Sequence, residues 1–376
     1  MSNTNIYCGD GTHIIVVLSQ NLSPVTTITL GNPLNGVSPG IYGMALTGDG
    51  ATLYAHTRGI ISQISTASNT VSATAQAPTL QIYSALVLSA DESLLYATGN
   101  VGGVDVYTTS PLAYQTRFGP TEIFLNSPGI GQCAGSLSPD GKTLVVSAIN
   151  GSTPELLFYD LGSNTLAGSY LPLSVDAFAG TSYDPSGDVV YMGLNRLTQS
   201  QIDVVSASSF SLLETLTITA PSSSASQDIF PDLDGESLWC SDSGTKLVQY
   251  ALPGLGILKS GSVSSGAAFS HFTQSPDDQF LYGFQGLLTT VFQVDKSMLS
   301  VVNSINLNTD VSELLSIIGV KVGSTPPAPS GTAPCACDWA EIASCTGTTW
   351  AGQSGPRSAF AVTNATANTW SKQGCN

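Results

Sequence analysis

Two residues in neighbouring repeats of this sequence, Asp228 and His271, could act together in chemistry. A carboxylate that orients an imidazole can form a general base or complete a metal shell. The alternative, which the sequence favours, is that the two residues form a structural hydrogen-bonded pair or are simply solvated by water, without a role in chemistry. Both residues stand eleven positions before the aromatic anchor of their repeat, where four other repeats carry small residues: Gly43, Ala85, Ala134 and Gly180.

Three further acids, Asp176, Asp310 and Glu313, lie near the junctions between repeats and would border the same face. They would bind a cation there, or form an ordinary solvated acidic rim. The other two histidines, His13 and His56, fall at or near the ends of predicted hairpins, so we expect both at the surface or in loops. A phosphate-binding glycine loop, a CxxCH haem motif and a G-x-S-x-G elbow are absent, and the sequence predicts no cofactor.

The element that must position these residues is a repeated hairpin, clearest in SPDGKTLVVSA from Ser138 to Ala148. A two-residue reversal at Asp140-Gly141 is expected to join two strands, because Asp can hydrogen-bond its own backbone and Gly accepts a positive φ. The residue that anchors the second strand recurs at intervals of 42, 49, 46, 48 and 43 residues: Tyr54, Tyr96, Val145, Tyr191, Trp239 and Tyr282. A period in the forties with four short strands per unit is typical of propeller blades.

The first blade is predicted to be split between the two ends of the sequence. Asn5-Ile6-Tyr7, His13 to Leu18 and Val25 to Leu30 match the second, third and fourth strands of a blade. The missing innermost strand is Ser312 to Val322, which would close the ring and remove its exposed edges. The sequence thus predicts an all-β, seven-bladed propeller over 1–322, with six further blades: 41–77, 82–118, 132–175, 178–220, 226–264 and 268–308.

Several segments resemble the YVTN-type repeat, whose blades run SPDG, LYVTN, VSVID and VVATI. The resemblance covers about residues 5 to 322, with SADES and DPSGD departing from the SPDG pattern, and its segments are LYAT from Leu95, VDVYTTS from Val104, SPDGKTLVV from Ser138 and QVDKSMLSVVNSINL from Gln293. It implies a seven-bladed propeller closed by a shared blade. Similar propellers include surface-layer and adhesion proteins, lactonases and cofactor-bearing oxidoreductases, so the fold does not decide the function.

A proline-rich linker at 323–334 leads into a tail at 335–376 that carries four of the seven cysteines. The tail has no histidine, and its cysteine spacing does not fit a zinc site. Two disulfides are the favoured reading, with free thiols in a tail docked on the propeller as the alternative. The tail cysteines are Cys335, Cys337, Cys345 and Cys375. The others, Cys8, Cys133 and Cys240, are expected to be small buried apolar residues.

Composition narrows the partners. Charged residues make up only 10% of the chain, against roughly 25% in typical soluble domains, and such a weakly hydrated surface favours contact with glycans or neighbouring subunits. The net charge of −16 repels phosphate backbones, so no nucleic-acid partner is expected. Apolar runs fall short of the roughly 18 residues that a membrane span needs. Repeat strands begin by Asn5, which leaves no room for a secretion signal.

These features together predict a non-catalytic module on a virion or extracellular surface, which binds a protein partner or assembles with itself through the tail. The competing hypothesis is a lactonase-type hydrolase that uses Asp228 and His271 in the funnel. Lactonase-like propellers would be expected to bring several His, Arg and Glu to one funnel, whereas this chain has three histidines in all. A cytoplasmic scaffold, with all seven thiols free, is a third hypothesis.

Overall fold

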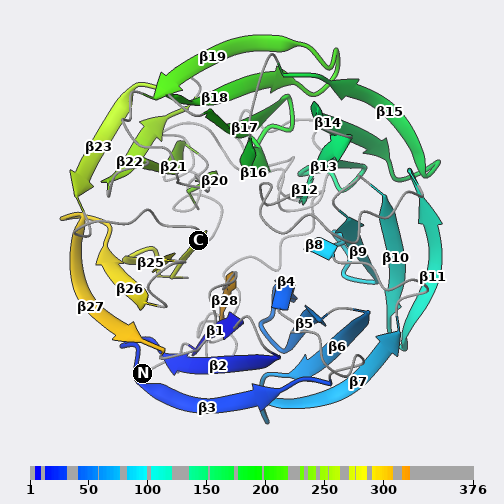
Figure 1. Ribbon diagram of the computed structural model, residues 1–376, viewed down its shortest axis with the longest axis vertical. Coiled ribbons are helices and arrows are strands. Elements are labelled where there is room, and N and C mark those ends of the chain that lie inside the picture. The colour runs from blue at the N-terminus through cyan, green and yellow to red at the C-terminus, as the bar shows by residue number, and fades with distance from the viewer. Residues whose placement is uncertain are drawn as a thin grey trace, which may run out of the picture. The chain divides into compact units, whose positions relative to one another are not determined.

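The computed structural model describes residues 5–9, 13–31, 41–57, 59–76, 83–99, 103–120, 135–150, 153–172, 177–196, 199–218, 229–232, 236–242, 246–252, 254–262, 271–275, 277–285, 290–307 and 316–321. In these ranges all regular elements are strands, and they form seven four-stranded antiparallel sheets. The sheets surround a common axis as blades (Figure 1). The predicted seven-bladed propeller is confirmed. It lies in the first of two units of the chain, Met1–Gly323; the second, Ser324–Asn376, is outside the described residues.

The first blade combines both ends of the propeller, as the sequence predicts. Its strands, from the axis outwards, are β28 (Ser316–Lys321), β1 (Asn5–Gly9), β2 (Ile14–Ser19) and β3 (Pro24–Thr29). The pairing of β28 with β1 is antiparallel, with Lys321 opposite Asn5 and Ser316 opposite Gly9. This pairing closes the ring, because β28 covers the inner edge of β1, which would otherwise be unpaired.

The other six blades follow the chain in order, each from its innermost to its outermost strand. The second to fourth blades are β4 (Ile41–Leu46), β5 (Thr52–Thr57), β6 (Ile60–Ser65) and β7 (Thr70–Gln76); β8 (Tyr83–Leu88), β9 (Leu94–Gly99), β10 (Val104–Thr109) and β11 (Leu112–Phe118); and β12 (Gly135–Leu137), β13 (Thr143–Asn150), β14 (Thr153–Asp160) and β15 (Thr165–Tyr170).

The fifth to seventh blades are β16 (Ala177–Tyr183), β17 (Val189–Arg196), β18 (Gln199–Ser206) and β19 (Leu212–Ile218); β20 (Ile229–Pro231), β21 (Ser237–Asp242), β22 (Lys246–Ala251) and β23 (Ile257–Ser262); and β24 (His271–Gln274), β25 (Phe280–Gln285), β26 (Thr290–Asp295) and β27 (Ser300–Asn306). Each predicted blade therefore contains the four strands expected of it.

The repeated hairpin is confirmed, but its turn is longer than predicted. Ser138 N donates to Thr143 O at 2.8 Å and Gly141 N donates to Ser138 O at 2.8 Å, with residues 139–142 between the paired ends. The prediction of a two-residue reversal was wrong because the Ser138 hydroxyl takes over part of the pairing. It accepts from Thr143 N at 2.9 Å and donates to Asp140 Oδ1 at 2.7 Å. Gly141 has the expected positive φ of 72°.

The hydrophobic core lies between successive blades. The six anchors of the repeat are all buried in second strands. One cluster joins Tyr7 and Ile15 of the split blade to Met44 and Leu53 of the next blade. Because each blade packs against a neighbour on both faces, its middle strands are apolar on both sides rather than alternating. Cys8 and Cys240 are buried in this core as predicted, and burial raises the pKa of the free Cys8 thiol to about 12.

Candidate functional site

The innermost strands crowd one another at the axis, as the small residues there suggest. A Cβ added to Gly43 in β4 would lie 3.2 Å from Leu86 N and 3.3 Å from the backbone of Ala85, both in β8 of the next blade. His271 is the first residue of β24, where its backbone pairs with Phe284. The innermost strand of this blade therefore begins at His271, as the sequence predicts.

The partner predicted for His271 lies outside the described residues, so their pairing stays a prediction. The same holds for the predicted acidic rim and for the cysteines other than Cys8 and Cys240. These residues are Asp228, Asp176, Asp310, Glu313, Cys133, Cys335, Cys337, Cys345 and Cys375. Among the residues that the structure does describe, no three His, Cys, Asp or Glu side chains gather to hold a metal ion.

His56 is a correction to the sequence analysis, because it is fully buried rather than in a loop or at the surface. It lies in β5, and its ring meets the Tyr83 ring of the next blade at a centroid distance of 4.4 Å. Neither ring nitrogen has a hydrogen-bond partner among the described residues. Burial lowers the pKa of His56 to about 3, so the imidazole is neutral at physiological pH.

His56 belongs to a polar group that we call the tyrosine cluster, whose other members are Tyr83, Asp105, Tyr107 and Arg117. The Tyr83 hydroxyl donates to Asp105 Oδ2 at 2.5 Å and lies 2.9 Å from the Tyr107 hydroxyl. Arg117 Nη1 lies 3.7 Å from the same carboxylate oxygen. Burial raises the pKa of Asp105, against the opposing effects of Tyr83 and Arg117. Within the described ranges, Asp105 Oδ1 and Arg117 Nε have no hydrogen-bond partner, so the cluster is incompletely paired.

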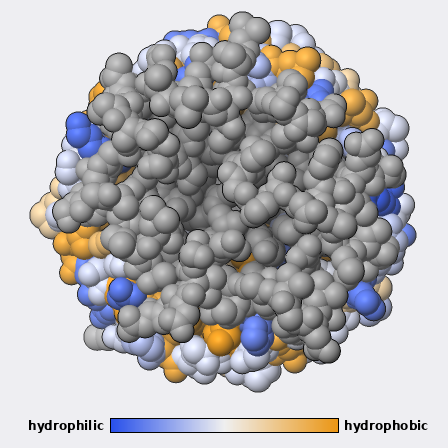
Figure 2. All heavy atoms as spheres, in the orientation of Figure 1, coloured by the Kyte–Doolittle hydropathy of each residue, from blue (hydrophilic) through white to orange (hydrophobic). Residues whose placement is uncertain are grey.

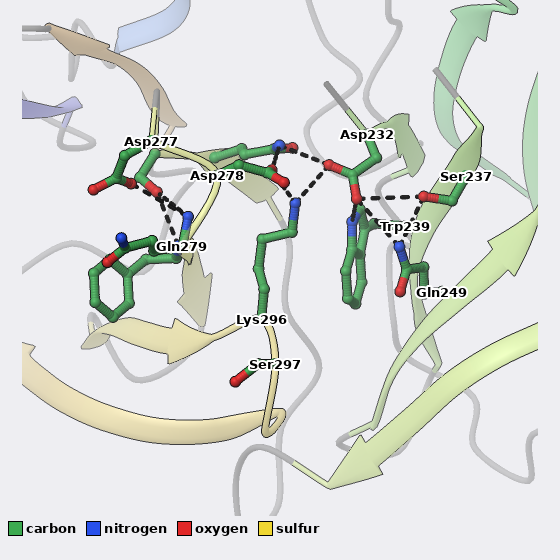
Figure 3. Close-up of polar contacts among 12 residues, drawn as sticks. Asp232, Ser237, Trp239, Gln249, Asp277, Asp278, Gln279, Lys296 and Ser297 are labelled. Atoms are coloured by element: carbon green, nitrogen blue, oxygen red, sulfur yellow. Dashed lines mark hydrogen bonds and ion pairs between the residues drawn. The ribbon is translucent and has the colours of Figure 1, made fainter. Parts of the chain in front are cut away.

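A second polar group, the lysine cluster, joins the sixth blade to the seventh (Figure 3). Its centre is Asp232, which follows β20 and is buried. Oδ1 accepts from Lys296 Nζ at 2.6 Å and from Gln274 Nε2 at 2.7 Å. Oδ2 accepts from three donors of its own blade, which are Trp239 Nε1 at 2.9 Å, Gln249 Nε2 at 3.2 Å and the Ser237 hydroxyl at 3.3 Å.

The lysine that completes this cluster lies between two carboxylates and over an aromatic ring. Lys296 follows β26, and its ammonium also pairs with Asp278 in the turn before β25. It lies 5.7 Å from the centroid of the Trp239 ring. Burial alone would raise the pKa of Asp232, but the bonds from Lys296 and Trp239 outweigh it and hold the pKa below its usual value. The arrangement fixes two blades together through one buried ion pair.

Neither member of this ion pair was predicted from the sequence, although each leaves a signal there. Asp232 begins the turn of the sixth blade, at the position that Ser138 holds in the fourth blade. The anchor that follows this turn is Trp239, whereas most repeats have a tyrosine there. Lys296 N donates to Gln279 O just as Leu161 N donates to Lys142 O, so Lys296 occupies a turn position that holds leucine in another blade. The clue was the lysine, because the equivalent turn position holds Thr66, Thr109, Leu161, Ala207 and Leu252 in five other blades and no other charged residue.

The outer strands carry the third notable feature, a set of exposed apolar side chains. Each of the seven fourth strands exposes at least one large apolar residue, which are Val25, Val71, Tyr114, Leu166, Leu212, Leu213, Ile257, Leu258, Val301 and Val302. Figure 2 shows orange, hydrophobic residues at several places around the rim, interspersed with pale and blue ones. Single exposed apolar residues are ordinary on a protein surface, so the part of this set that indicates a contact surface is the adjacent pairs Leu212-Leu213, Ile257-Leu258 and Val301-Val302.

Comparisons with known proteins support the fold alone. No family model and no curated protein matches the chain. Among solved structures, the hydrazine synthase of Kuenenia stuttgartiensis is similar, with a TM-score of 0.60 and 14% sequence identity over 76% of this chain and 90% of that one. Across the described part of this chain, no helix is long and apolar enough to cross a membrane.

Proposed function

We propose that this protein is a non-catalytic β-propeller that serves as a structural or interaction module on a virion or cell surface. Propellers commonly mediate interactions, and the observation that carries the proposal is the exposed apolar rim. An outer strand that faces water has no packing reason to expose pairs such as Leu212-Leu213 and Ile257-Leu258. A protein partner that covers the rim supplies that reason. Membership of the YVTN-type repeat family is part of the same proposal.

The tail is the proposed means of attachment. In the sequence, residues 323–334 between the propeller and residues 335–376 contain four prolines, a composition that favours an extended spacer. Two disulfides among the four tail cysteines would hold a segment too small for a core of its own. A tail of this kind would bind a partner or other copies of the chain, and the weakly charged surface leaves glycans as a further class of ligand.

The first experiment separates a binding module from a lactonase-type hydrolase. The purified full chain is incubated with sugar lactones, with the His271→Ala variant as the matched control. The proposal expects the two proteins to show the same background hydrolysis. Turnover by the wild type that disappears in the variant would overturn it, because it would assign a catalytic role to the inner end of β24.

The second experiment tests the external location. Non-reducing peptide mapping, with free thiols alkylated under denaturing conditions, reports the state of Cys335, Cys337, Cys345 and Cys375. Two tail disulfides are expected, formed in an oxidising compartment. Seven alkylated thiols would contradict this part of the proposal and favour a cytoplasmic scaffold. Cys8, a free buried thiol of β1, serves as the internal control for complete alkylation.

A further inference from the structure

All seven outer strands contain a β-bulge at the same point, one residue that has no partner in the register with the third strand. In β19, for example, Val204 pairs with Glu214 and Val205 pairs with Leu212, which leaves Leu213 as the extra residue. In β23 the same shift leaves Leu258 between Ile257 and Lys259. A bulge bends an edge strand away from further pairing, so each bulge protects its blade from adding a strand of another chain.

The residues at the bulges divide the ring into two halves. Four consecutive blades carry a large, exposed apolar residue there: Leu213 in β19 (58% exposed), Leu258 in β23 (55%), Val302 in β27 (47%) and Val25 in β3 (51%). The other three consecutive blades carry the small or polar residues Ser72 in β7, Gln115 in β11 and Ala167 in β15. In Figure 1 the four strands that carry these residues follow one another around the left half of the ring, from β19 at the top through β23 and β27 to β3 at the bottom.

We call these four strands the apolar arc. In three of them the residue before the bulge is also a large exposed apolar residue, so the arc presents adjacent pairs: Leu212-Leu213, Ile257-Leu258 and Val301-Val302. The opposite half exposes single apolar side chains, Val71, Tyr114 and Leu166, beside its polar or small bulge residues. Single exposed apolar residues are ordinary on a protein surface, whereas contiguous pairs along neighbouring blades form a patch.

The charges on the arc are compatible with a second copy of the chain as its partner. Its four strands contain one acid and one base, Glu214 and Lys259, so the arc is neutral on a chain with a net charge of −16. Both follow their bulge directly, at equivalent positions of neighbouring blades. A two-fold axis between β19 and β23 would place Glu214 of each copy opposite Lys259 of the other, since an isologous contact is self-complementary. Lys259 Nζ donates to Lys296 O at 3.4 Å and has two further protons for such a pair.

We infer that the part of the apolar arc formed by β19 and β23 is the interface of a homodimer, in which β19 and β23 of one copy pack side chain against side chain on β23 and β19 of a second copy. The bulges exclude a continuous sheet across the interface. The inference deepens the proposed function by naming a second copy of this chain as the partner. The inference rests on the proposed function in one respect, which is that the protein is a module that assembles with a partner.

The test measures the mass of the full chain by sedimentation equilibrium from 1 to 100 µM. The wild type is expected to reach twice the mass of a single chain within this range. The double variant Leu213→Asp, Leu258→Asp is expected to weaken the dimer at least 100-fold, because it buries two carboxylates in an apolar contact. The matched control, Ser72→Asp with Gln115→Asp, changes the same bulge position on the opposite half and should leave the dissociation constant within threefold.

A charge swap tests the geometry without disturbing the apolar residues. Glu214→Lys and Lys259→Glu alone should each weaken the dimer about tenfold, and the two together should restore it. A wild type that stays monomeric at 100 µM would overturn the inference, as would equal weakening by the control variant or a failure of the combined swap to restore the dimer. A dimer that survives all these variants but dissociates on reduction would also overturn it and would favour assembly through the tail. Turnover of lactones would contradict the proposed function, but it would not change the masses measured here, so the two proposals can fail separately.

Discussion

The two polar clusters between blades differ in how completely they are paired. In the lysine cluster, Asp232 accepts five hydrogen bonds and faces a buried ammonium that reaches a second carboxylate. Within the described ranges, Asp105 of the tyrosine cluster accepts one hydrogen bond and has an arginine 3.7 Å away, and His56 has no hydrogen-bond partner. The comparison shows two ways of burying charge and polarity in one repeat architecture. A fully paired cluster stabilises its junction, and an incompletely paired one makes its junction sensitive to pH.

The largest effect is expected from Lys296→Met in the lysine cluster. The change leaves the Asp232 carboxylate buried without its counter-charge, which costs about 3 to 5 kcal/mol. Urea unfolding at pH 7 measures the loss. Lys142→Met is the matched control, since the Lys142–Asp140 pair is exposed and worth no more than about 0.5 kcal/mol. A loss of less than about 1 kcal/mol in Lys296→Met would show that the ion pair does not stabilise the junction.

The next effect concerns the pH dependence that His56 gives to the tyrosine cluster. The unfolded chain protonates this histidine near pH 6.5, whereas the folded chain does so only near pH 3. The contribution to stability is therefore complete above pH 6.5 and is lost as the pH falls toward 3. Between pH 7 and pH 5 the loss amounts to about 2 kcal/mol from this one group.

The variant His56→Phe isolates that contribution, because it keeps a ring against Tyr83 and removes the titrating nitrogens. Urea midpoints measured at pH 7 and pH 5 should fall further in the wild type than in His56→Phe, by the same 2 kcal/mol. Carboxylates elsewhere also respond to acid, but they are common to both proteins and cancel in the difference. Identical pH profiles would mean that His56 is not buried and neutral as described.

A smaller effect compares two equivalent aspartates. Asp105 in β10 and Asp203 in β18 each follow the first apolar residues of a third strand and are buried. Asp203 accepts from Tyr170, Gln201 and Thr215, at 2.8, 2.9 and 2.7 Å. Tyr83→Phe removes the one hydrogen bond that Asp105 accepts among the described residues and should cost about 2 kcal/mol, whereas Tyr170→Phe leaves two donors on Asp203 and should cost about 1 kcal/mol. Thermal unfolding of both variants gives the order. Equal losses would show that the two clusters are paired alike.

The sequence predicted the blades far better than it predicted these clusters, and the reason is physical. Each anchor such as Tyr54 repeats because every second strand meets the same environment, and the split blade follows from the need to close an edge. The lysine cluster does not repeat. Its members come from turns 64 residues apart, Asp232 and Lys296, so no local pattern joins them. His56 was assigned to a loop or the surface because it ends a predicted hairpin, whereas the next blade covers it with Tyr83.

The smallest effect is expected from Asp278→Asn, which removes the exposed one of the two carboxylates around Lys296. Asp278 is 51% exposed and has a φ of 60°, a backbone conformation that asparagine also tolerates. Solvent screens its charge, so the loss should stay below about 1 kcal/mol and should disappear in 1 M NaCl, where the screening length is about 3 Å. Asp232→Asn should cost several times more and should keep its effect in salt, because its ion pair is buried. If both variants lost the same stability, Lys296 would be bound equally by the two carboxylates. The lysine cluster and the tyrosine cluster would then differ only in the number of hydrogen bonds that their buried aspartates accept.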